Sequence, residues 1–518
     1  MRSPRSRKRG LSEVIGTLFF VLIIFVAMSF FLVMFDSFSN YASTLKHVNQ
    51  QQIQQGETKF SIPSFSFGSS GGVGTVATTV AQTSTSYSQE RKLLYSQGLW
   101  WVFYSYGARG GGQGLMYQSS PDGATWSSPV SISTMANTQY GFDFSVYQNG
   151  TYVDIVIASG SQFDWRYGIM YPNGIISFPY GFASHSTTNS VVPSDGFCSI
   201  VTDVSGNTWV ALNTQSGGPT EYIEVWEHLG PGNTNRGTWT RVDYLSGLPT
   251  DVAPILVPTS SGVAMMYGSG ATTGTLSITN TTISNPTTWS LAVSPPSYYA
   301  MLDSSAVAVG NNIYFAGLAS STSGSSSGTV DYFSYTAGQS STSPESVLQA
   351  ASSSWQVSIS VCSKTLDVFF GTGSNLYFIF SDNLGQSFGA TQTISTSENS
   401  ITGVTSAYSA PGVVWMSGSS SPFNLRFFAS SVVSITNSSP FPIHLISLYI
   451  YDTTANVLYH FDTNSSASGV SGSFDYWMAP GQTLTVPESF NWIPSDSFSI
   501  TVTTDQGLIA AFYLTAPA

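Results

Sequence analysis

The chain has 518 residues, of which only 8% are charged, and its 27 acidic and 15 basic residues give a formal net charge of -12 at pH 7. Because a surface of this sign repels phosphate backbones, we expect no nucleic-acid partner. Glycine and aromatic residues are abundant, so hydroxyl and amide groups must supply much of the solubility that Lys and Glu usually give.

The N-terminus combines a basic cluster with a long apolar run. Five Lys or Arg residues lie within residues 2–9, and residues 14–35 contain no charge. At about 1.5 Å per residue, a helix of this length crosses the ~30 Å hydrocarbon layer of a bilayer. The basic cluster would stay in the cytoplasm. The sequence therefore predicts a transmembrane α-helix within residues 11–56, with the remainder of the chain outside the cell.

The residues that lead into this helix carry a first resemblance. The order of a basic cluster, Gly10, Leu11, Ser12 and Glu13 before the apolar run resembles the class III leader of archaeal type IV pilins and pilin-like surface proteins. The resemblance implies a leader of residues 1–10, which a prepilin peptidase removes between Gly10 and Leu11. The helix would then remain as a membrane anchor or pack among filament subunits. An ordinary uncleaved signal anchor is the alternative.

Seven segments between residues 85 and 430 repeat one pattern, an apolar strand, a tight turn and a second apolar strand, as in LLYSQGLWWVFYSY. The turn residues are Gly98, Gly150, Gly206, Gly262, Gly310, Lys364 and Gly412. A period of about 50 residues with several short strands per unit is typical of radial β-propeller blades. The sequence predicts an all-β fold with a propeller of about seven blades over residues 85–430. Six or eight blades, or a stacked array of sandwiches, are the alternatives.

Two segments resemble the Asp-box of sialidases and related propeller proteins, a Ser-x-Asp-x-Gly-x-Thr-aromatic turn. The matching residues are Ser120, Asp122, Gly123 and Trp126 in SSPDGATW, and Ser381, Asn383, Gly385 and Phe388 in SDNLGQSF. The aspartate is displaced by one place in the first copy and replaced by Asn383 in the second. The resemblance implies a turn between the outer strands of a blade, with a capping side chain, a glycine and an aromatic plug. It concerns the fold rather than catalysis.

Residues 90–130 also resemble the first blade of the sialidase family, whose three arginines bind a carboxylate. Arg91 and Arg109 stand near the places of two of them, and a guanidinium can donate two parallel hydrogen bonds to one carboxylate. No arginine occurs between Arg241 and Arg426, and the loop GARGGGQG lacks the family's acid. Because a retaining hydrolase needs both a nucleophile and a positioned acid, binding is favoured over hydrolysis. Hydrogen bonding between blades is the other interpretation of the two arginines.

An aspartate precedes the hairpin in four successive repeats. These residues are Asp143, Asp195, Asp251 and Asp303. If each begins the innermost strand of its blade, the four carboxylates face the mouth of the central channel, where they could bind Ca²⁺ or sugar hydroxyls. Two of them could also act as acid and base. Capping of a turn is the structural alternative for each.

After about residue 430 the strands alternate apolar and polar residues, as in SFSITVTTDQGLIAAFYL. This pattern predicts a small β-sandwich over residues 431–518, whose APGQT turn loosely resembles the C-terminal domains of archaeal pilin-like proteins. The segment TKFSIPSFSF alternates in the same way at residues 58–67, within a strand and linker segment of residues 57–84. We expect this strand to pair with the sandwich, with the propeller inserted between them.

The cysteines and the glycosylation triplets give little information about fold or function. Cys198 and Cys362 are too few for a disulfide framework, and we expect both to be buried apolar groups rather than one bridge. Asn-x-Ser/Thr triplets make four residues candidates for glycosylation outside the cell: Asn149, Asn280, Asn437 and Asn464.

These features predict a membrane-anchored or pilin-like extracellular protein that displays its propeller for binding or adhesion, to glycans or to another surface partner. A propeller glycoside hydrolase, sialidase-like, or a lyase is the alternative. Ca²⁺ at the four aspartates is the one cofactor that the residues suggest. The sequence shows no His and Cys ligand spacing, phosphate loop or Ser-His-Asp order.

Overall fold

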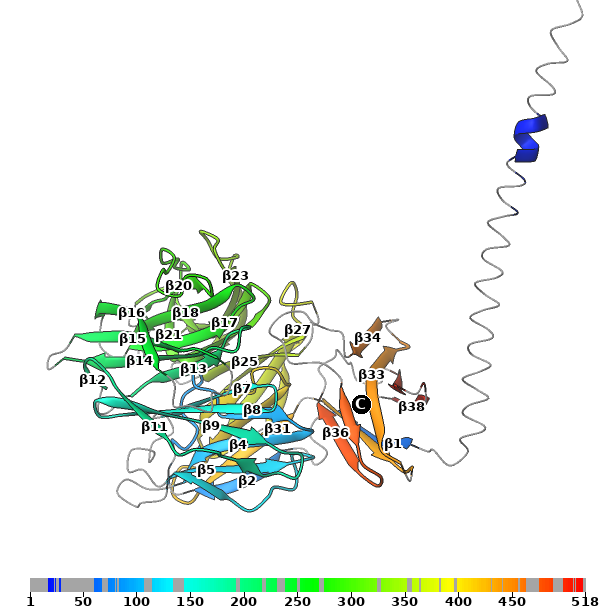
Figure 1. Ribbon diagram of the computed structural model, residues 1–518, viewed down its shortest axis with the longest axis horizontal. Coiled ribbons are helices and arrows are strands. Elements are labelled where there is room, and N and C mark those ends of the chain that lie inside the picture. The colour runs from blue at the N-terminus through cyan, green and yellow to red at the C-terminus, as the bar shows by residue number, and fades with distance from the viewer. Residues whose placement is uncertain are drawn as a thin grey trace, which may run out of the picture.

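The computed structural model gives a nearly all-β protein. It describes residues 17–22, 24, 28, 60–67, 73–79, 81, 83–106, 114–133, 144–191, 196–216, 220–230, 238–248, 252–269, 274–323, 328–351, 356–362, 365–381, 383–395, 398–429, 431–439, 441–454, 457–462, 475–487, 497–505, 507 and 509–515. Figure 1 shows a large body of sheets, the propeller, with a smaller sandwich beside it.

The N-terminal segment is described only in part. Residues 17–22 are helical, and no helix in the described part of the chain has the length and apolar character needed to cross a bilayer. The remainder of the helix predicted within residues 11–56 lies outside the described residues, and so do the leader and its cleavage residues Gly10, Leu11 and Glu13. The membrane helix therefore stays a prediction.

The first four blades follow one another along the chain. Blade 1 orders β3 (Leu93–Ser96), β4 (Leu99–Ser105), β5 (Leu115–Ser120) and β6 (Val130–Ser133). Blade 2 orders β7 (Phe144–Asn149), β8 (Tyr152–Ser159) and β9 (Gln162–Met170), which pairs with both β10 (Ile176–Ser177) and β11 (Ala183–Ser186). In blade 3, β13 (Cys198–Thr202) and β12 (Ser190–Val191) pair with β14 (Thr208–Gln215), followed by β15 (Glu221–His228) and β16 (Trp239–Leu248). Blade 4 orders β17 (Val252–Pro258), β18 (Gly262–Ser269) and β20 (Ser277–Thr282).

Three further blades complete the propeller. Blade 5 orders β21 (Tyr298–Val309), β22 (Asn312–Ser320), β23 (Gly328–Thr336) and β24 (Ser346–Ala351), with β19 (Gly274–Thr275) on the other side of β21. Blade 6 orders β25 (Gln356–Cys362), β26 (Thr365–Thr372), β27 (Asn375–Ser381) and β28 (Gln392–Ser395). Blade 7 orders β29 (Ile401–Ser406), β30 (Gly412–Ser417), β31 (Phe423–Ala429) and β2 (Gly74–Thr79).

The seven blades form a closed ring. Neighbouring blades contact through their first strands, in the order β3, β7, β13, β17, β21, β25 and β29, and β3 contacts blade 7 through β30. The predicted turn glycines join the first and second strands of their blades, for example Gly98 between β3 and β4. Within the described residues the structure thus has the seven radial sheets that the repeats predict.

A strand from the beginning of the chain closes the ring. β2 pairs antiparallel with β31, and Gly74 lies opposite Phe427. Blade 7 therefore combines three strands from the end of the propeller sequence with one from before its first blade. The sequence pattern alone had placed these residues in a linker, because their partner lies some 350 positions away and the pairing is tertiary.

The sandwich consists of two sheets. One orders β1 (Phe60–Phe67), β32 (Ser431–Asn437) and β36 (Thr483–Pro487). The other, the outer sheet, orders β34 (Val457–Asp462), β33 (Ile443–Asp452), β37 (Ser497–Thr504) and β38 (Ile509–Thr515), with β35 (Tyr476–Met478) also paired to β33. β1 pairs antiparallel with β32, with Phe60 opposite Asn437. The expected pairing of this N-terminal strand with the sandwich is confirmed.

Burial explains why the two domains differ in sequence pattern. Every side chain of β4, LWWVFYS, is buried, because a second strand of a blade is covered by blades on both faces. β37, SFSITVTT, alternates between half-buried and buried residues, because only one face of the sandwich sheet meets the core. Cys198 and Cys362 are both buried and unbridged, as expected.

Candidate functional site

Residues 83–92, TSTSYSQERK, run along the axis of the propeller. Thr85 Oγ1 donates a 2.8 Å hydrogen bond to Gly403 O in blade 7, and Ser88 N donates one of 3.1 Å to Leu302 O in blade 5. Val146 N in blade 2 donates to Arg91 O at 3.1 Å. A segment that contacts blades on all sides of the ring lies at its centre, so chain atoms rather than solvent occupy this part of the axis.

Arg91 is buried among backbone carbonyls of three blades. Its guanidinium donates to Ala306 O at 2.7 Å, to Ile359 O at 2.9 Å, and to the Ser406 hydroxyl at 2.9 Å. Burial lowers the pKa of Arg91 to about 10, so the side chain stays charged at neutral pH. Of the two interpretations of Arg91, these contacts agree with hydrogen bonding between blades, which occupies donors that a ligand carboxylate would need. Arg109, its predicted companion, lies outside the described residues.

The neighbours of Arg91 form a fully buried ion pair. Lys92 Nζ lies 2.7 Å from Glu90 Oε2, and both side chains have no exposed surface. Lys92 also donates to Phe144 O and lies 3.7 Å from the centre of the Phe144 ring. Glu90 Oε1 accepts from Cys198 N at 3.2 Å. Each charge thus has several partners, as a buried charge requires. Glu90, Arg91 and Lys92 are three consecutive charged residues in a chain with few charges. This run was the sequence signal for the buried cluster, and sequence reasoning did not use it.

Of the four predicted aspartates, the structure describes Asp303. It lies in β21 beside a break in register between Ala300 and Ser304. Burial raises the pKa of Asp303 to about 7, and a hydrogen bond from Gln356 opposes this shift. Gln356 Oε1 in turn accepts from Val404 N at 3.0 Å. Asp303 is therefore linked to blade 6 by Gln356, and through Gln356 to blade 7.

The proposed carboxylate cluster remains a prediction. Asp143, Asp195 and Asp251 lie outside the described residues. Within the part of the chain that the structure describes, no three His, Cys, Asp or Glu side chains lie together so as to hold a metal ion. Asp303 alone offers one carboxylate, which falls short of the six to eight oxygen ligands that Ca²⁺ takes.

The first Asp-box is a turn between β5 and β6, the two outer strands of blade 1. Ser120 Oγ accepts from Gly123 N at 2.8 Å, and Asp122 Oδ1 accepts from Thr125 N at 2.8 Å. Gly123 has a φ of 71°, and a side chain there would collide with the ring of Phe427 in blade 7. The Trp126 ring packs 5.3 Å from the same ring. The turn thus stabilises the contact between two blades.

The second Asp-box, between β27 and β28, uses an amide for the same purpose. Ser381 Oγ accepts from Gly385 N at 2.8 Å, and Asn383 Oδ1 accepts from Ser387 N at 2.9 Å. Phe388 packs 4.9 Å from Tyr332 in the preceding blade. Asn383 therefore replaces the motif's aspartate without loss of the cap. Both motifs have structural roles in the described turns.

A cleft lies between the propeller and the sandwich, with a volume of about 430 Å³. Its propeller side comes from the turn at Gly98, the first Asp-box and the turn at Gly174, and its sandwich side comes from Gln482 and Leu484. Gly98 has a φ of 74° and lies so close to Leu484 that any side chain at this position would collide with it. The two domains are thus in direct contact beside the cleft.

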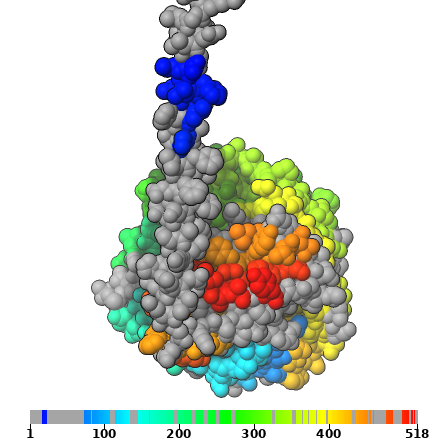
Figure 2. Space-filling view, turned by 90° about the vertical axis from the view of Figure 1, so that its right-hand side faces the viewer, coloured from blue at the N-terminus to red at the C-terminus, as the bar shows by residue number. Residues whose placement is uncertain are grey.

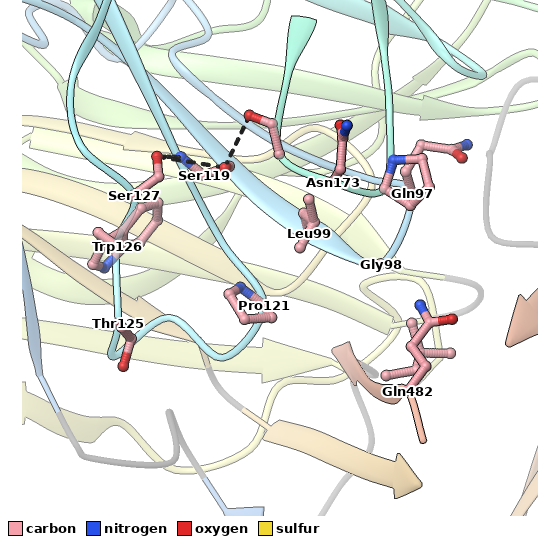
Figure 3. Close-up of a pocket in the computed structure, with 13 residues that line it drawn as sticks. Gln97, Gly98, Leu99, Ser119, Pro121, Thr125, Trp126, Ser127, Asn173 and Gln482 are labelled. Carbon is pink, nitrogen blue, oxygen red and sulfur yellow. Dashed lines mark hydrogen bonds between the residues drawn. The ribbon is translucent and has the colours of Figure 1, made fainter. Parts of the chain in front are cut away.

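Three amide side chains from separate segments line this cleft. Figure 3 shows Gln97 and Asn173 near one another and Gln482 across from them. Asn173 Oδ1 accepts from Ile175 N at 3.2 Å and Gln482 Oε1 accepts from Ala479 N at 2.8 Å, which fixes both carboxamides. Within the described part of the chain, the amide nitrogens of all three residues donate no hydrogen bond. The cleft therefore presents oriented donors to a ligand.

The remainder of the lining is apolar or hydroxylic. Leu99, Pro121, Pro172 and Trp126 contribute apolar surface, and Thr125, Ser119 and Ser127 contribute hydroxyls. Ser119 Oγ donates to Gly174 O at 3.3 Å, which joins blade 1 to blade 2 at the cleft (Figure 3). None of the lining residues is ionisable. Sequence analysis missed this site, because its parts come from turns of three sheets that only the tertiary fold brings together.

The glycosylation candidates differ in accessibility. Asn437 is fully buried, and its amide nitrogen donates to the carbonyls of Phe441, Met478 and Ala479 at 2.9 to 3.1 Å. In the folded sandwich this nitrogen cannot receive a sugar, so the prediction for Asn437 is wrong. Asn149 and Asn280 are half-buried, and Asn464 lies outside the described residues.

Comparisons with known proteins yield structural likenesses at low sequence identity. No family model and no curated protein matches the chain. It is similar to the BP39L lectin from Burkholderia pseudomallei, with 11% identity and a TM-score of 0.45 over 68% of this chain and 96% of the lectin. It is also similar to a Trypanosoma rangeli sialidase, with 9% identity and a TM-score of 0.38 over 83% of this chain and 88% of the sialidase. These likenesses are too distant to transfer a site or an activity.

Proposed function

We propose that this protein is a carbohydrate-binding protein of the cell surface, and that the cleft between propeller and sandwich binds a neutral saccharide. The carrying observation is that the amide nitrogens of Gln97, Asn173 and Gln482, which donate no hydrogen bond within the described residues, converge on a cleft with no ionisable lining residue. Sugar hydroxyls accept hydrogen bonds from such NH₂ groups. Their positions are set by the turns that hold them, so little ordering is needed on binding.

The apolar part of the lining supports the same ligand class. A pyranose ring has C–H faces as well as hydroxyl edges, and it therefore needs apolar surface beside hydrogen-bonding groups. Leu99, Pro121 and Trp126 supply that surface. A charged ligand would find no counter-charge among the lining residues and would lose its hydration. A neutral oligosaccharide therefore fits better than an acidic one.

Display outside the cell is part of the proposal. Supporting it are the apolar run of residues 14–35 and the basic cluster before it. Cleavage between Gly10 and Leu11 by a prepilin peptidase would leave the helix as an anchor or as packing among filament subunits. Mass spectrometry of the mature N-terminus tests this step, and an intact Met1 in the cell-surface protein would contradict cleavage.

The binding site is tested with isosteric changes. Gln482→Glu keeps the oxygen that accepts from Ala479 N but removes the amide donors. Asn173→Asp likewise keeps the oxygen that accepts from Ile175 N and removes the amide donors. We expect each to weaken binding about tenfold on an array of neutral, amino and acidic saccharides, which corresponds to about 1.4 kcal/mol. Gln386→Glu, in the exposed turn of the second Asp-box, is the control of equal charge and should bind as the parent does.

A second pair of variants blocks the cleft. Thr125→Trp places a large ring at an exposed position of the cleft lining. Thr288→Trp is the control, because it places the same ring at an exposed position of blade 4 that does not line the cleft. We expect the first to abolish saccharide binding and the second to leave it unchanged. Equal binding by Thr125→Trp and the parent would exclude the cleft as the site.

One observation favours hydrolysis as a second candidate function. Asp303 has a pKa raised to about 7, and a carboxyl group of that pKa is suited to act as a general acid near neutral pH. A panel of chromogenic glycosides distinguishes the two functions. If the protein hydrolyses a glycoside, and Asp303→Asn abolishes this turnover while Thr125→Trp does not, a hydrolase site at Asp303 is supported. If the protein binds saccharides without turnover, a binding site in the cleft is supported.

A further inference from the structure

The outer sheet of the sandwich carries a tryptophan with most of its surface in solvent. Trp477 in β35 is 68% exposed. In Figure 2, which views the molecule from the sandwich side, strands of the outer sheet (orange to red) lie in front of the propeller and are open to solvent. Trp477 is not among the residues that line the cleft, although the lining residue Gln482 follows it by five positions. Single exposed apolar side chains are common on protein surfaces, so Trp477 is informative only together with the groups around it.

The indole is held by a histidine and two carboxylates. Trp477 and His444 are cross-strand partners, and their rings stack with centres 4.4 Å apart and planes at 5°. Asp475 contacts Nε2 of His444, and Asp505 Oδ2 lies 3.3 Å from Nδ1. These two carboxylates raise the pKa of His444. Both ring nitrogens of His444 thus have a carboxylate partner, and these contacts favour the ring orientation on which the indole stacks.

We propose that Trp477, Asp475 and Asp505 form a second saccharide site, a platform for one pyranose ring, independent of the cleft. One face of the indole is covered by His444, so its exposed surface belongs to the other face and the edges. The C–H face of a pyranose stacks on such a ring. The two carboxylates are 49% and 38% exposed, and each has a second oxygen that can accept from a sugar hydroxyl.

Other ligand classes fit this arrangement less well. A cationic ligand over the indole would have on its far side His444, whose positive form the two carboxylates favour by raising its pKa, and a positive imidazole opposes the attraction of the carboxylates. A purely apolar partner would remove the water from Asp475 and Asp505 without replacing their hydrogen bonds. An anionic ligand would be repelled by both carboxylates. A neutral pyranoside combines an apolar face with hydroxyl donors and meets both requirements.

The consequence is a chain with two separate sugar contacts. When both engage one polymer, the second contact forms at a high effective concentration, and the chain binds a polysaccharide more tightly than either site does. This proposal does not rest on the cleft, and the two can fail separately.

The test uses the full-length protein in a detergent without a sugar headgroup, with Thr125→Trp as background to close the cleft. Binding to cellulose, chitin and mannan is measured by depletion from solution. Trp477→Ala should weaken binding to at least one of them about tenfold, or about 1.4 kcal/mol, while Trp477→Tyr should retain most of it. Tyr513→Ala is the matched control, because it removes an equally exposed ring from the same sheet.

Three results would overturn the platform. They are unchanged binding by Trp477→Ala on all three polymers, no binding by the Thr125→Trp background, and an equal loss in Tyr513→Ala, which would mark general apolar adsorption. Thermal unfolding of each variant is recorded alongside, and Trp477→Tyr restores a ring at the same position, so a loss of folding is distinguished from a loss of binding.

Discussion

The propeller and the sandwich use charged groups in opposite ways. At the propeller axis, Glu90, Arg91 and Lys92 are consecutive, fully enclosed and committed to backbone or to one another. On the sandwich, His444 and its two aspartates lie at the surface, with carboxylate oxygens that face solvent. The difference shows that residue type alone does not mark a site. Enclosed charges hold blades together, and exposed charges beside an oriented ring can meet a ligand.

The largest effect is expected at the enclosed pair. Lys92→Met leaves the Glu90 carboxylate buried without its counter-charge, and breaking a buried pair in this way costs about 3–5 kcal/mol of unfolding free energy. Urea denaturation followed by tryptophan fluorescence measures it. The double variant Glu90→Gln, Lys92→Met should recover part of the loss, because no charge is then left unpaired. A single-variant loss below about 1 kcal/mol would show that water reaches the axis.

The next effect concerns the turns that join blades. Asp122→Ala removes the acceptor for two backbone N–H groups, of Ala124 and Thr125, and should lower the unfolding free energy by about 1–2 kcal/mol. Asp122→Asn should cost much less, since Asn383 fills this role in the second Asp-box. Differential scanning calorimetry compares the two. Equal losses would mean that charge, rather than the cap, matters in this turn.

A smaller and pH-dependent effect is expected at Asp303. Its folded-state pKa of about 7 lies above the ordinary value of 3.8, so the folded protein keeps a proton that the unfolded chain has lost, and stability falls as pH rises from about 4 to about 7. Asp303→Asn should remove this decline and be more stable than the parent at pH 8, on the order of 1 kcal/mol after allowance for its partial exposure. Denaturation at pH 5 and pH 8 provides the check, and parallel curves for both proteins would contradict it.

The smallest effect belongs to the exposed cluster. The pKa of His444 is raised in the folded state, so its contribution is complete below the unfolded value near 6.5 and is lost as pH rises through the folded value. His444→Gln should remove this pH dependence, with a change of no more than about 1 kcal/mol because the partners are exposed. Denaturation of both proteins at pH 5.5 and 8.5 measures it. A larger change in unfolding free energy would mean that these groups behave as buried charges, like those at the propeller axis.

Much of the fold could be predicted from local sequence patterns, whereas little of the candidate site could be predicted from them. The hairpins around Gly98, Gly150 and Gly206 gave the period of the blades, because strand propensity and turn chemistry act over a few residues. The pairing of residues 58–67 with the sandwich was predicted from alternation. For Arg91 the sequence left ligand binding and hydrogen bonding between blades open, because a guanidinium bound to backbone carbonyls and one that binds a ligand have the same local sequence; the structure shows the second.

The sequence by itself determined that the chain alternates short strands and tight turns, that its Asp-box turns carry aromatic plugs, and that its cysteines are buried. These follow from residue types and spacings within short segments, which the sequence states directly. Only the tertiary structure decided that β2 closes the ring, that residues 83–92 lie on the axis, and that Gln97, Asn173 and Gln482 meet at one cleft. Each of these joins segments far apart in the chain, and the burial that gives them their role exists only once the blades and the sandwich have packed.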